Sequence, residues 1–225
     1  MLTRTVLSII CLLPALAIAH NIAGGDASFV ASNAGAAPGP FIYLGAKHMV
    51  TGYDHLLFLA GVIFFLSRAL DVIKYVTLFA AGHSITLIIG VLGDIAINAY
   101  FIDAIIALSV VYKALENMGA FQTLGRWKPD TRAAVFVFGL FHGFGLASSL
   151  QELQLAPEGL LINLISFNLG VEIGQMIALF MIFIVFMLWR QHPSFQRQAF
   201  LSNTLLMTAG FLLMFYQLAA WQLAA

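Results

Sequence analysis

The chain has 225 residues, of which 61% are hydrophobic and only 9% charged, with equal numbers of acidic and basic side chains. A soluble domain usually carries about 25% charged residues, so a surface fully exposed to water is excluded and lipid must cover much of it. The net charge is zero, so nothing points to nucleic acid, which is usually bound by a basic surface. The single cysteine, Cys11, lies near the N-terminus, so a thiolate metal site in the remainder is excluded as well.

Residues 1–19 have the pattern of a secretory signal peptide. Arg4 supplies the positive start, residues 6–18 form a short apolar stretch, and Ala17-Ile18-Ala19 is a cleavage site of the small-x-small type. The alternative is an uncleaved first helix, which the short stretch and Pro14 disfavour. We therefore expect an exported protein whose first 19 residues are removed.

The segment that follows the predicted cleavage site, residues 20–40, is rich in Gly, Ala, Ser, Asn and Pro. This composition predicts a flexible exported segment. Cleavage after Ala19 would make His20 the first residue, with an amine and an imidazole that could together chelate Cu(II) or Ni(II). His20 is therefore a weaker candidate for external metal capture.

The rest of the chain, residues 41–225, contains apolar stretches long enough to cross a bilayer, which needs about 20 residues. We expect crossings at residues 42–66, 72–92, 96–117, 133–150, 160–189 and 200–222. Lys and Arg flank the first, third and fifth connections, and the second, the fourth and the C-terminal tail have none. Because positive loops stay in the cytoplasm, both mature termini are expected on the periplasmic side. The predicted fold is an all-α integral membrane protein of the bacterial inner membrane, a bundle of six transmembrane helices.

Ionisable side chains inside these stretches predict the functional site, because each costs at least about 2.5–3.5 kcal/mol at the bilayer centre. Four different stretches contribute them at similar depth, with one histidine nearer the exported side. The candidates are His48, Asp54, His55, His83, His142 and Glu172, with Asn168 and Asp103 as weaker ones. Acidic residues at helix ends, such as Glu116, are interpreted as solvated.

Two of these histidines lie on the same stretch, and their spacing leaves two interpretations open. On a continuous helix the Cα atoms of His48 and His55 would be about 10.5 Å apart, which is long for two ligands of one ion. Either they are successive stations along a path, or the helix breaks at Gly52.

Small residues flank two of the candidates. His142 lies between Gly139 and Gly143, and Glu172 lies between Gly170 and Gly174. Glycines four residues apart let helix backbones approach closely. We therefore expect these candidates beside helix contacts.

Imidazoles and carboxylates without thiolate suit Ni(II), Co(II), Zn(II), Cu(II) or Fe(II), whereas Mg²⁺ and Ca²⁺ prefer oxygen ligands alone. A proton relay could use the same groups without a metal. The residue types therefore indicate a buried site for a transition metal or for protons.

Over about residues 44–178 the sequence resembles the HupE/UreJ family of membrane proteins, which is associated with hydrogenase and urease maturation. The resemblance rests on five motifs, GAKHMVTGYDHLLFL, AAGHSITL, DAIIALSVVYKALEN, GLFHGFGLA and FNLGVEIGQ. It implies an exported signal, a six-helix core and a nickel or cobalt permease. It also implies that the six main candidates form the site. The chain differs in lacking a histidine-rich first exported segment.

The expected function is transport of a divalent transition metal, with nickel favoured over cobalt, zinc and copper, and the protein is not expected to be an enzyme. Expected partners are the metal ion and the lipid bilayer but no nucleic acid. Metalloenzyme maturation proteins or a second copy of the chain are further candidates. One alternative is an intramembrane zinc-dependent metallohydrolase, with Glu172 or Asp54 as general base. The other is a non-catalytic assembly factor that holds metal or partners.

Overall fold

The structure, a computed structural model, describes residues 35–127, 129–151 and 157–224. Within these ranges, the side chains of five residues lie outside the description: Tyr53, Asp54, Thr123, Arg126 and Trp127. The predicted signal peptide and His20 also lie outside the described residues.

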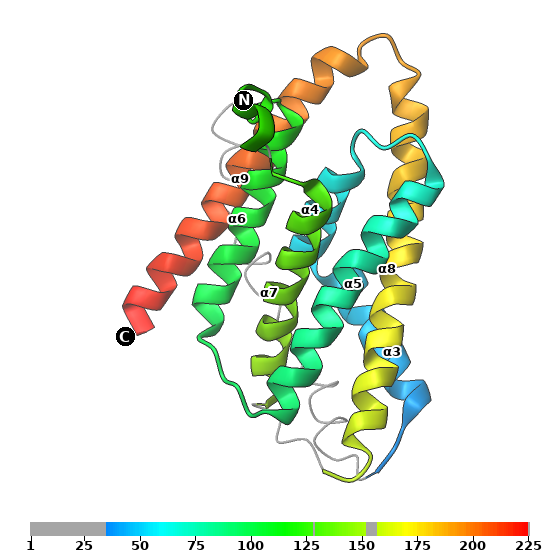
Figure 1. Cartoon of the computed structure of the whole chain (residues 1–225), viewed down its shortest axis with the longest axis vertical. Coiled ribbons are helices and arrows are strands. Elements are labelled where there is room, and N and C mark those ends of the chain that lie inside the picture. The colour runs from blue at the N-terminus through cyan, green and yellow to red at the C-terminus, as the bar shows by residue number, and fades with distance from the viewer. Residues whose placement is uncertain (1–34, 128, 152–156, 225) are drawn as a thin grey trace, which may run out of the picture.

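All the regular secondary structure in the described part of the chain is helical, which confirms the predicted all-α class (Figure 1). Its elements are α3 (Pro38–Thr51), α4 (Tyr53–Ile63), α5 (Ala69–Leu92), α6 (Ala99–Asn117), the short 3-10 helix η1 (Gln122–Trp127), α7 (Thr131–Gln151), α8 (Leu160–Arg190) and α9 (Phe195–Ala224). The first predicted crossing is divided into α3 and α4. Because α3 begins at Pro38, the end of the segment expected to be flexible is helical.

Four of these helices, α5, α7, α8 and α9, are long and apolar enough to cross a membrane. Helices α3 and α4 are each too short, with 14 and 11 residues. Helix α6 carries three charged residues, Asp103, Lys113 and Glu116, within 19 residues. The length and composition of the four long helices indicate a membrane protein.

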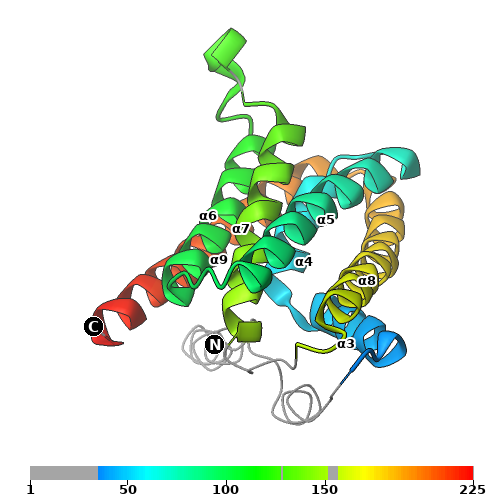
Figure 2. The ribbon, with the colours of Figure 1, turned by 60° about the horizontal axis from the view of Figure 1, so that its bottom comes forward.

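Close backbone contacts hold the helices in three pairs, α5 with α7, α3 with α8, and α6 with α9. Figures 1 and 2 show α6 and α9 at one edge, α3 and α8 at the opposite edge, and α4, α5 and α7 between them. A Cβ atom at Gly170 would lie 2.0 Å from the carbonyl oxygen of Ile42, and one at Gly143 would lie 2.2 Å from that of His83. Only glycine fits such contacts, so the predicted role of the glycine pairs is confirmed.

The same glycine contacts fix the relative direction of the paired helices. Gly170 faces Ile42 and Gly174 faces Ala46, so residue numbers rise together and α3 runs parallel to α8. Residues 44–48 of α3 therefore lie beside residues 172–176 of α8. Parallel packing agrees with the expectation that the first and fifth crossings run in the same direction.

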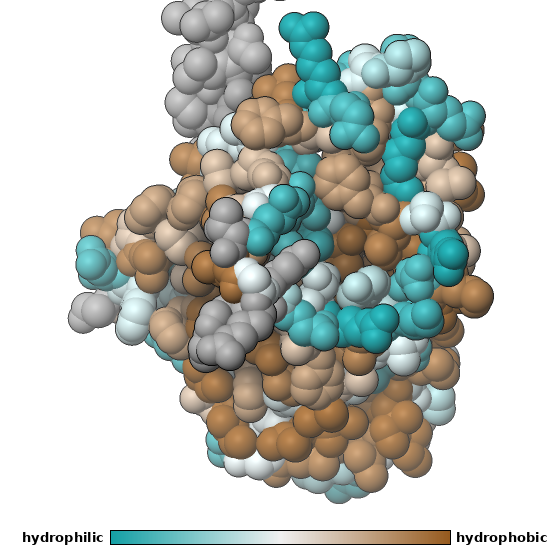
Figure 3. All heavy atoms as spheres, turned by 45° about the horizontal axis from the view of Figure 1, so that its top comes forward, coloured by the Kyte–Doolittle hydropathy of each residue, from teal (hydrophilic) through white to brown (hydrophobic). Residues whose placement is uncertain are grey.

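Apolar side chains cover much of the outer surface. Figure 3 shows hydrophilic side chains gathered toward one end of the molecule and apolar ones covering the flank beneath it. On α8, Ile177, Met181 and Leu188 are 61%, 63% and 65% exposed, and Phe200 and Leu205 on α9 are similar. Such a continuous apolar surface is suited to contact with lipid.

A group of polar side chains, which we call the α6 cluster, joins α6 to its neighbours. It consists of five residues, Lys113, Glu116, Asn117, Thr131 and Asn203. The Nζ atom of Lys113 lies 2.8 Å from Oε2 of Glu116, and only 8% and 9% of these side chains are exposed. The prediction that Glu116 is solvated is therefore wrong, because Lys113 and the Thr131 hydroxyl cover its carboxylate.

Candidate functional site

The break between α3 and α4 shapes the centre of the molecule. Gly52 has φ −76° and ψ 92°, an extended conformation, and its N–H donates to the carbonyl of His48 at 2.9 Å. A Cβ atom at Gly52 would lie 2.5 Å from Nδ1 of His55. The imidazole of His55 thus folds back over the glycine. Of the two interpretations left open by the sequence, the break at Gly52 is the one confirmed.

The break brings His48 and His55 together, and two further helices add a histidine each. The ring centroid of His55 lies 5.2 Å from that of His48, 4.6 Å from that of His142 and 6.4 Å from that of His83. We call these four residues the histidine cluster. His55, His83 and His142 are 0% exposed, and His48 is 9% exposed. Helices α3, α4, α5 and α7 thus bring all four predicted histidines to one place.

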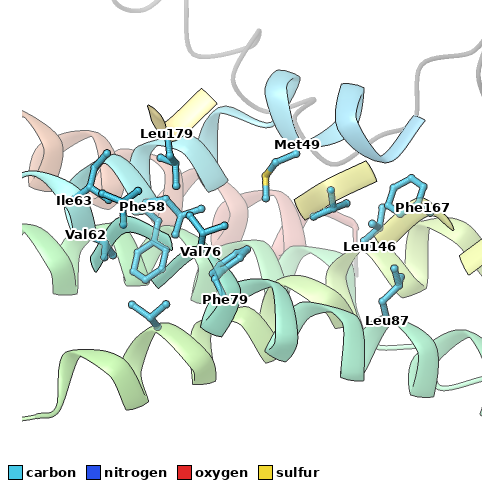
Figure 4. Packing of buried hydrophobic residues seen from close by; sticks show 14 of the residues in the cluster. Met49, Phe58, Val62, Ile63, Val76, Phe79, Leu87, Leu146, Phe167 and Leu179 are labelled. Atoms are coloured by element: carbon cyan, nitrogen blue, oxygen red, sulfur yellow. The ribbon is translucent and has the colours of Figure 1, made fainter. Parts of the chain in front are cut away.

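Aromatic and aliphatic side chains enclose the histidine cluster. The ring centroid of Phe79 lies 4.8 Å from that of His142, and that of Phe167 lies 5.9 Å from that of His48. Figure 4 shows that α4, α5 and α8 supply buried apolar side chains toward the C-terminal half of α4. This group, the apolar plug, consists of Phe58, Val62, Ile63, Val76 and Leu179, each at most 4% exposed. Few dipoles screen charge there, so a charge in the cluster would interact strongly with its neighbours.

Asn168 orients one of the four rings. Its Nδ2 donates to the carbonyl of Leu164 at 2.9 Å, so Oδ1 faces α5, where it accepts from Ser84 Oγ at 2.9 Å. Oδ1 also lies 3.4 Å from Nδ1 of His83. An amide oxygen can only accept, so a hydrogen bond here requires a proton on Nδ1 of His83, and in the neutral ring this leaves the lone pair on Nε2. Asn168, a weaker candidate ligand from the sequence, thus acts on His83 as an outer partner of the kind that commonly fixes a metal-binding histidine.

The predicted acidic residues are distributed more widely than the histidines. Glu172 is partly buried on α8, one turn after Asn168 and on the same face of the helix. Asp103 accepts from Nε2 of Gln217 at 3.2 Å, which places it at the contact between α6 and α9. Asp54 belongs to α4, but its side chain lies outside the description.

One buried polar residue, Gln175, is missing from the sequence-based candidates. Its side chain is 0% exposed, and neither Oε1 nor Nε2 has a hydrogen-bond partner among the described residues. The available signal was its position three residues after Glu172, on the same helix.

The spacing of the rings, but not yet their orientation, suits a shared metal ion. An imidazole bound to a metal at about 2.0–2.1 Å has its centroid about 3.2 Å from the ion, so two such rings lie roughly 4.5–6.5 Å apart. The three distances from His55 fall in this range. In the described part of the chain, however, no three His, Cys, Asp or Glu side chains are arranged to hold a metal. Ring rotation is therefore needed before three imidazoles can ligate one ion.

The fold and the histidine cluster together indicate an all-helical membrane protein with four buried histidines at its centre. The chain matches the family model described as HupE / UreJ protein over residues 24–225, and it therefore belongs to that family. Comparisons with curated proteins and with solved structures gave no match.

Proposed function

We propose that the protein transports a divalent transition-metal ion, with nickel favoured over cobalt, across the bacterial inner membrane. The observation that carries the proposal is the convergence of four histidines from four helices, three of them fully buried. Imidazole nitrogen is a good ligand for these ions. Ionisable groups placed inside a membrane domain commonly mark the path of an ion. The family, associated with the maturation of hydrogenase and urease, supports the choice of nickel.

The proposal includes six membrane crossings after a cleaved signal peptide, with both mature termini in the periplasm. Helices α3 and α4 together are long enough for the first crossing, which needs about 20 residues. Helix α6 makes the third crossing. Its charges can enter the bilayer because Lys113 pairs with Glu116 and Asp103 accepts from Gln217.

In the proposed path, the ion enters from the periplasmic side past His48 and reaches the other three histidines. Asp54 and Glu172 would supply negative charge, because imidazole ligands alone cannot neutralise a divalent cation in a weakly polar environment. Metal binding requires deprotonated imidazoles, so acid should weaken it. The apolar plug closes the route toward the cytoplasm, so release requires its side chains to separate.

The break at Gly52 supports movement of α4 during release. Secondary transporters commonly form their substrate sites from discontinuous helices near the middle of the membrane. Helix α4 carries His55 near its first turn and Phe58, Val62 and Ile63 of the plug farther along. A rotation of α4 about Gly52 would therefore change the histidine cluster and the plug together.

The test is metal uptake into proteoliposomes that contain the purified full-length protein, with nickel, cobalt, zinc and copper compared in parallel. His55→Ala and His142→Ala should abolish uptake. The matched control is His192→Ala, because His192 is exposed between α8 and α9 and contacts Ser194. Selective uptake that both cluster variants lose and the control keeps would support transport.

The opposite result would be no uptake of any metal together with metal that stays bound during purification. The transport proposal would then fail. A protein that holds metal, either as an assembly factor or as a metallohydrolase, would take its place.

A further inference from the structure

Gln175 stands apart from the other buried amide side chains of the described residues. Asn163, Asn203 and Gln217 each hydrogen-bond to backbone or side-chain atoms, as Asn168 does. Gln175 is fully buried, and neither of its amide atoms has such a partner in the described part of the chain. Native proteins rarely bury a polar group in this way, so each case requires an explanation.

Two helix contacts place Gln175 beside the histidine cluster. Gly174 faces Ala46 in the parallel pair of α3 and α8, so Gln175 lies at nearly the depth of His48, within about 1.5 Å along the helix axis. On α8 it also lies seven residues, or two turns, beyond Asn168 and on the same face. Asn168 contacts His83. The face of α8 that contacts His83 through Asn168 therefore continues to Gln175, which lies at the depth of His48.

The backbone at Gln175 has little freedom to move toward a different partner. A Cβ atom at Gly174 would lie only 2.7 Å from the carbonyl oxygen of Ala46, so α8 is pressed against α3 there. Val171 and Leu179, one turn to either side, are 1% and 0% exposed and offer no polar side chain. The missing partner of the Gln175 amide must therefore be a group that moves to the amide, such as a bound ligand.

We infer that Gln175 is a further ligand of the transported ion, and that its Oε1 binds the ion when the ion reaches the histidine cluster. The inference rests on the proposed transport function. A neutral amide oxygen is compatible with nickel and cobalt ligation by mixed nitrogen and oxygen donors. An added oxygen also raises the ligand number above the four that zinc usually takes. Gln175 would therefore favour nickel or cobalt over zinc.

The experiment measures binding of nickel chloride and zinc chloride to the purified full-length protein by calorimetry, together with the unfolding temperature without metal. Gln175→Leu should weaken nickel binding at least about tenfold, because even loss of an outer partner of a metal ligand typically costs 10- to 100-fold in affinity. Zinc binding should change less. Without metal, the variant should unfold at the same or a higher temperature, because it no longer buries an unpartnered amide.

Gln151→Leu is the matched control, because Gln151 on α7 donates to the carbonyl of Gly90 at 2.6 Å. It should lower the unfolding temperature and leave nickel affinity unchanged. Gln175→Glu covers the case in which the leucine variant does not fold. It keeps an oxygen at the same position, so it should bind nickel at least as tightly as the parent.

The results separate this inference from the proposed function. Nickel binding by Gln175→Leu at the parental affinity, or a glutamate variant that binds nickel more weakly than the parent, would overturn the role of Gln175. His142→Ala is measured alongside. If His142→Ala also binds nickel as the parent does, the histidine site itself fails. If only His142→Ala loses binding, the transport site stands and Gln175 is not a ligand.

Discussion

Asn168 on α8 and Asn203 on α9 make the same local hydrogen bond but belong to two different polar clusters. Each donates from Nδ2 to the carbonyl oxygen four residues earlier, at 2.9 Å. The side-chain oxygen of Asn203 then accepts from Asn117 at 2.9 Å, within the α6 cluster. That of Asn168 accepts from Ser84 and faces His83.

The two clusters differ in the chemistry of their side chains. In the α6 cluster, Lys113 pairs with Glu116, Thr131 donates to the same carboxylate, and Asn117 bridges the carbonyl of Gly61 and Asn203. These groups satisfy one another and join four helices, which suits a structural role. The histidine cluster instead gathers four imidazole rings, a side-chain type that commonly binds metal ions. The comparison separates a structural polar cluster from the cluster that we propose binds the ion, and measurements of stability and of metal binding can test that division.

The largest effect on stability is expected from breaking the buried ion pair. Lys113→Met should cost about 3–5 kcal/mol of unfolding free energy, because it leaves the Glu116 carboxylate buried without its cation. Unfolding of the purified protein in detergent measures this cost. The double variant Lys113→Met/Glu116→Gln should recover most of it, and the folded fraction of both variants should bind nickel as the parent does. A single variant as stable as the parent would remove the structural role of the pair.

The next effect is expected at the break between α3 and α4. Gly52→Ala adds a Cβ atom that would lie 2.5 Å from Nδ1 of His55. This distance is too short for a van der Waals contact, so the His55 ring must turn away from the other histidines. Nickel affinity should fall about 10- to 100-fold, the range seen when the orientation of a metal ligand is lost, and calorimetry measures it.

Gly61→Ala is the control for this prediction because it lies on the same helix but faces the α6 cluster. Its Cβ atom would lie 3.1 Å from Cγ of Lys113, a flexible neighbour. Nickel affinity should stay unchanged. Equal losses of affinity in both variants would mean that any disturbance of α4 weakens binding and that the geometry at Gly52 has no special part.

Much of the fold could be predicted from the sequence because helices that cross a membrane require long apolar stretches. Each predicted stretch contains a helix, and the paired glycines identified two of the helix contacts. The convergence of His55, His83 and His142 also followed from their matched depth. These features depend on the length of the apolar stretches and on the spacing of residues along them, and both can be read from the sequence.

The remaining features depend on contacts between helices that are distant in sequence. Glycine is common inside membrane helices, so Gly52 alone could not distinguish a break from a continuous helix. Glu116 was expected in solvent from its place at a helix end, but Thr131 from the following helix covers it. The amide of Gln175 is fully buried and has no hydrogen-bond partner among the described residues, and a sequence cannot show that.

A smaller effect is expected from the two asparagines. Asn168→Ala removes the acceptor that holds Nδ1 of His83, so nickel affinity should fall about tenfold, near the lower end of the range for such outer partners. Asn203→Ala should leave nickel affinity unchanged and cost about 1–3 kcal/mol of unfolding free energy, because the partly buried amide of Asn117 loses an acceptor. The two variants are compared by calorimetry and by unfolding in detergent. Interchanged results, with Asn203→Ala weakening nickel binding, would contradict the division between the clusters.

The smallest effect is expected at the far end of α4, the helix that contacts both clusters. The guanidinium of Arg190 donates to the carbonyl oxygens of Leu66 and Ile63, the latter at 3.1 Å. Lysine cannot form this fork, so Arg190→Lys should lose about 1 kcal/mol of unfolding free energy. Equilibrium nickel affinity should not change, because His55 lies at the opposite end of α4.

The informative measurement for Arg190→Lys is the rate of nickel uptake. If α4 must move to open the apolar plug, loss of about 1 kcal/mol of restraint should speed uptake by up to about fivefold. Gln198→Ala is a suitable control, since in the described part of the chain the Gln198 side chain accepts its hydrogen bond from the nearby Trp189 ring nitrogen. Slower uptake by Arg190→Lys would mean instead that Arg190 holds α4 in the conformation that releases the ion. The movement that opens the apolar plug would then have to begin at the N-terminal end of α4, beside Gly52.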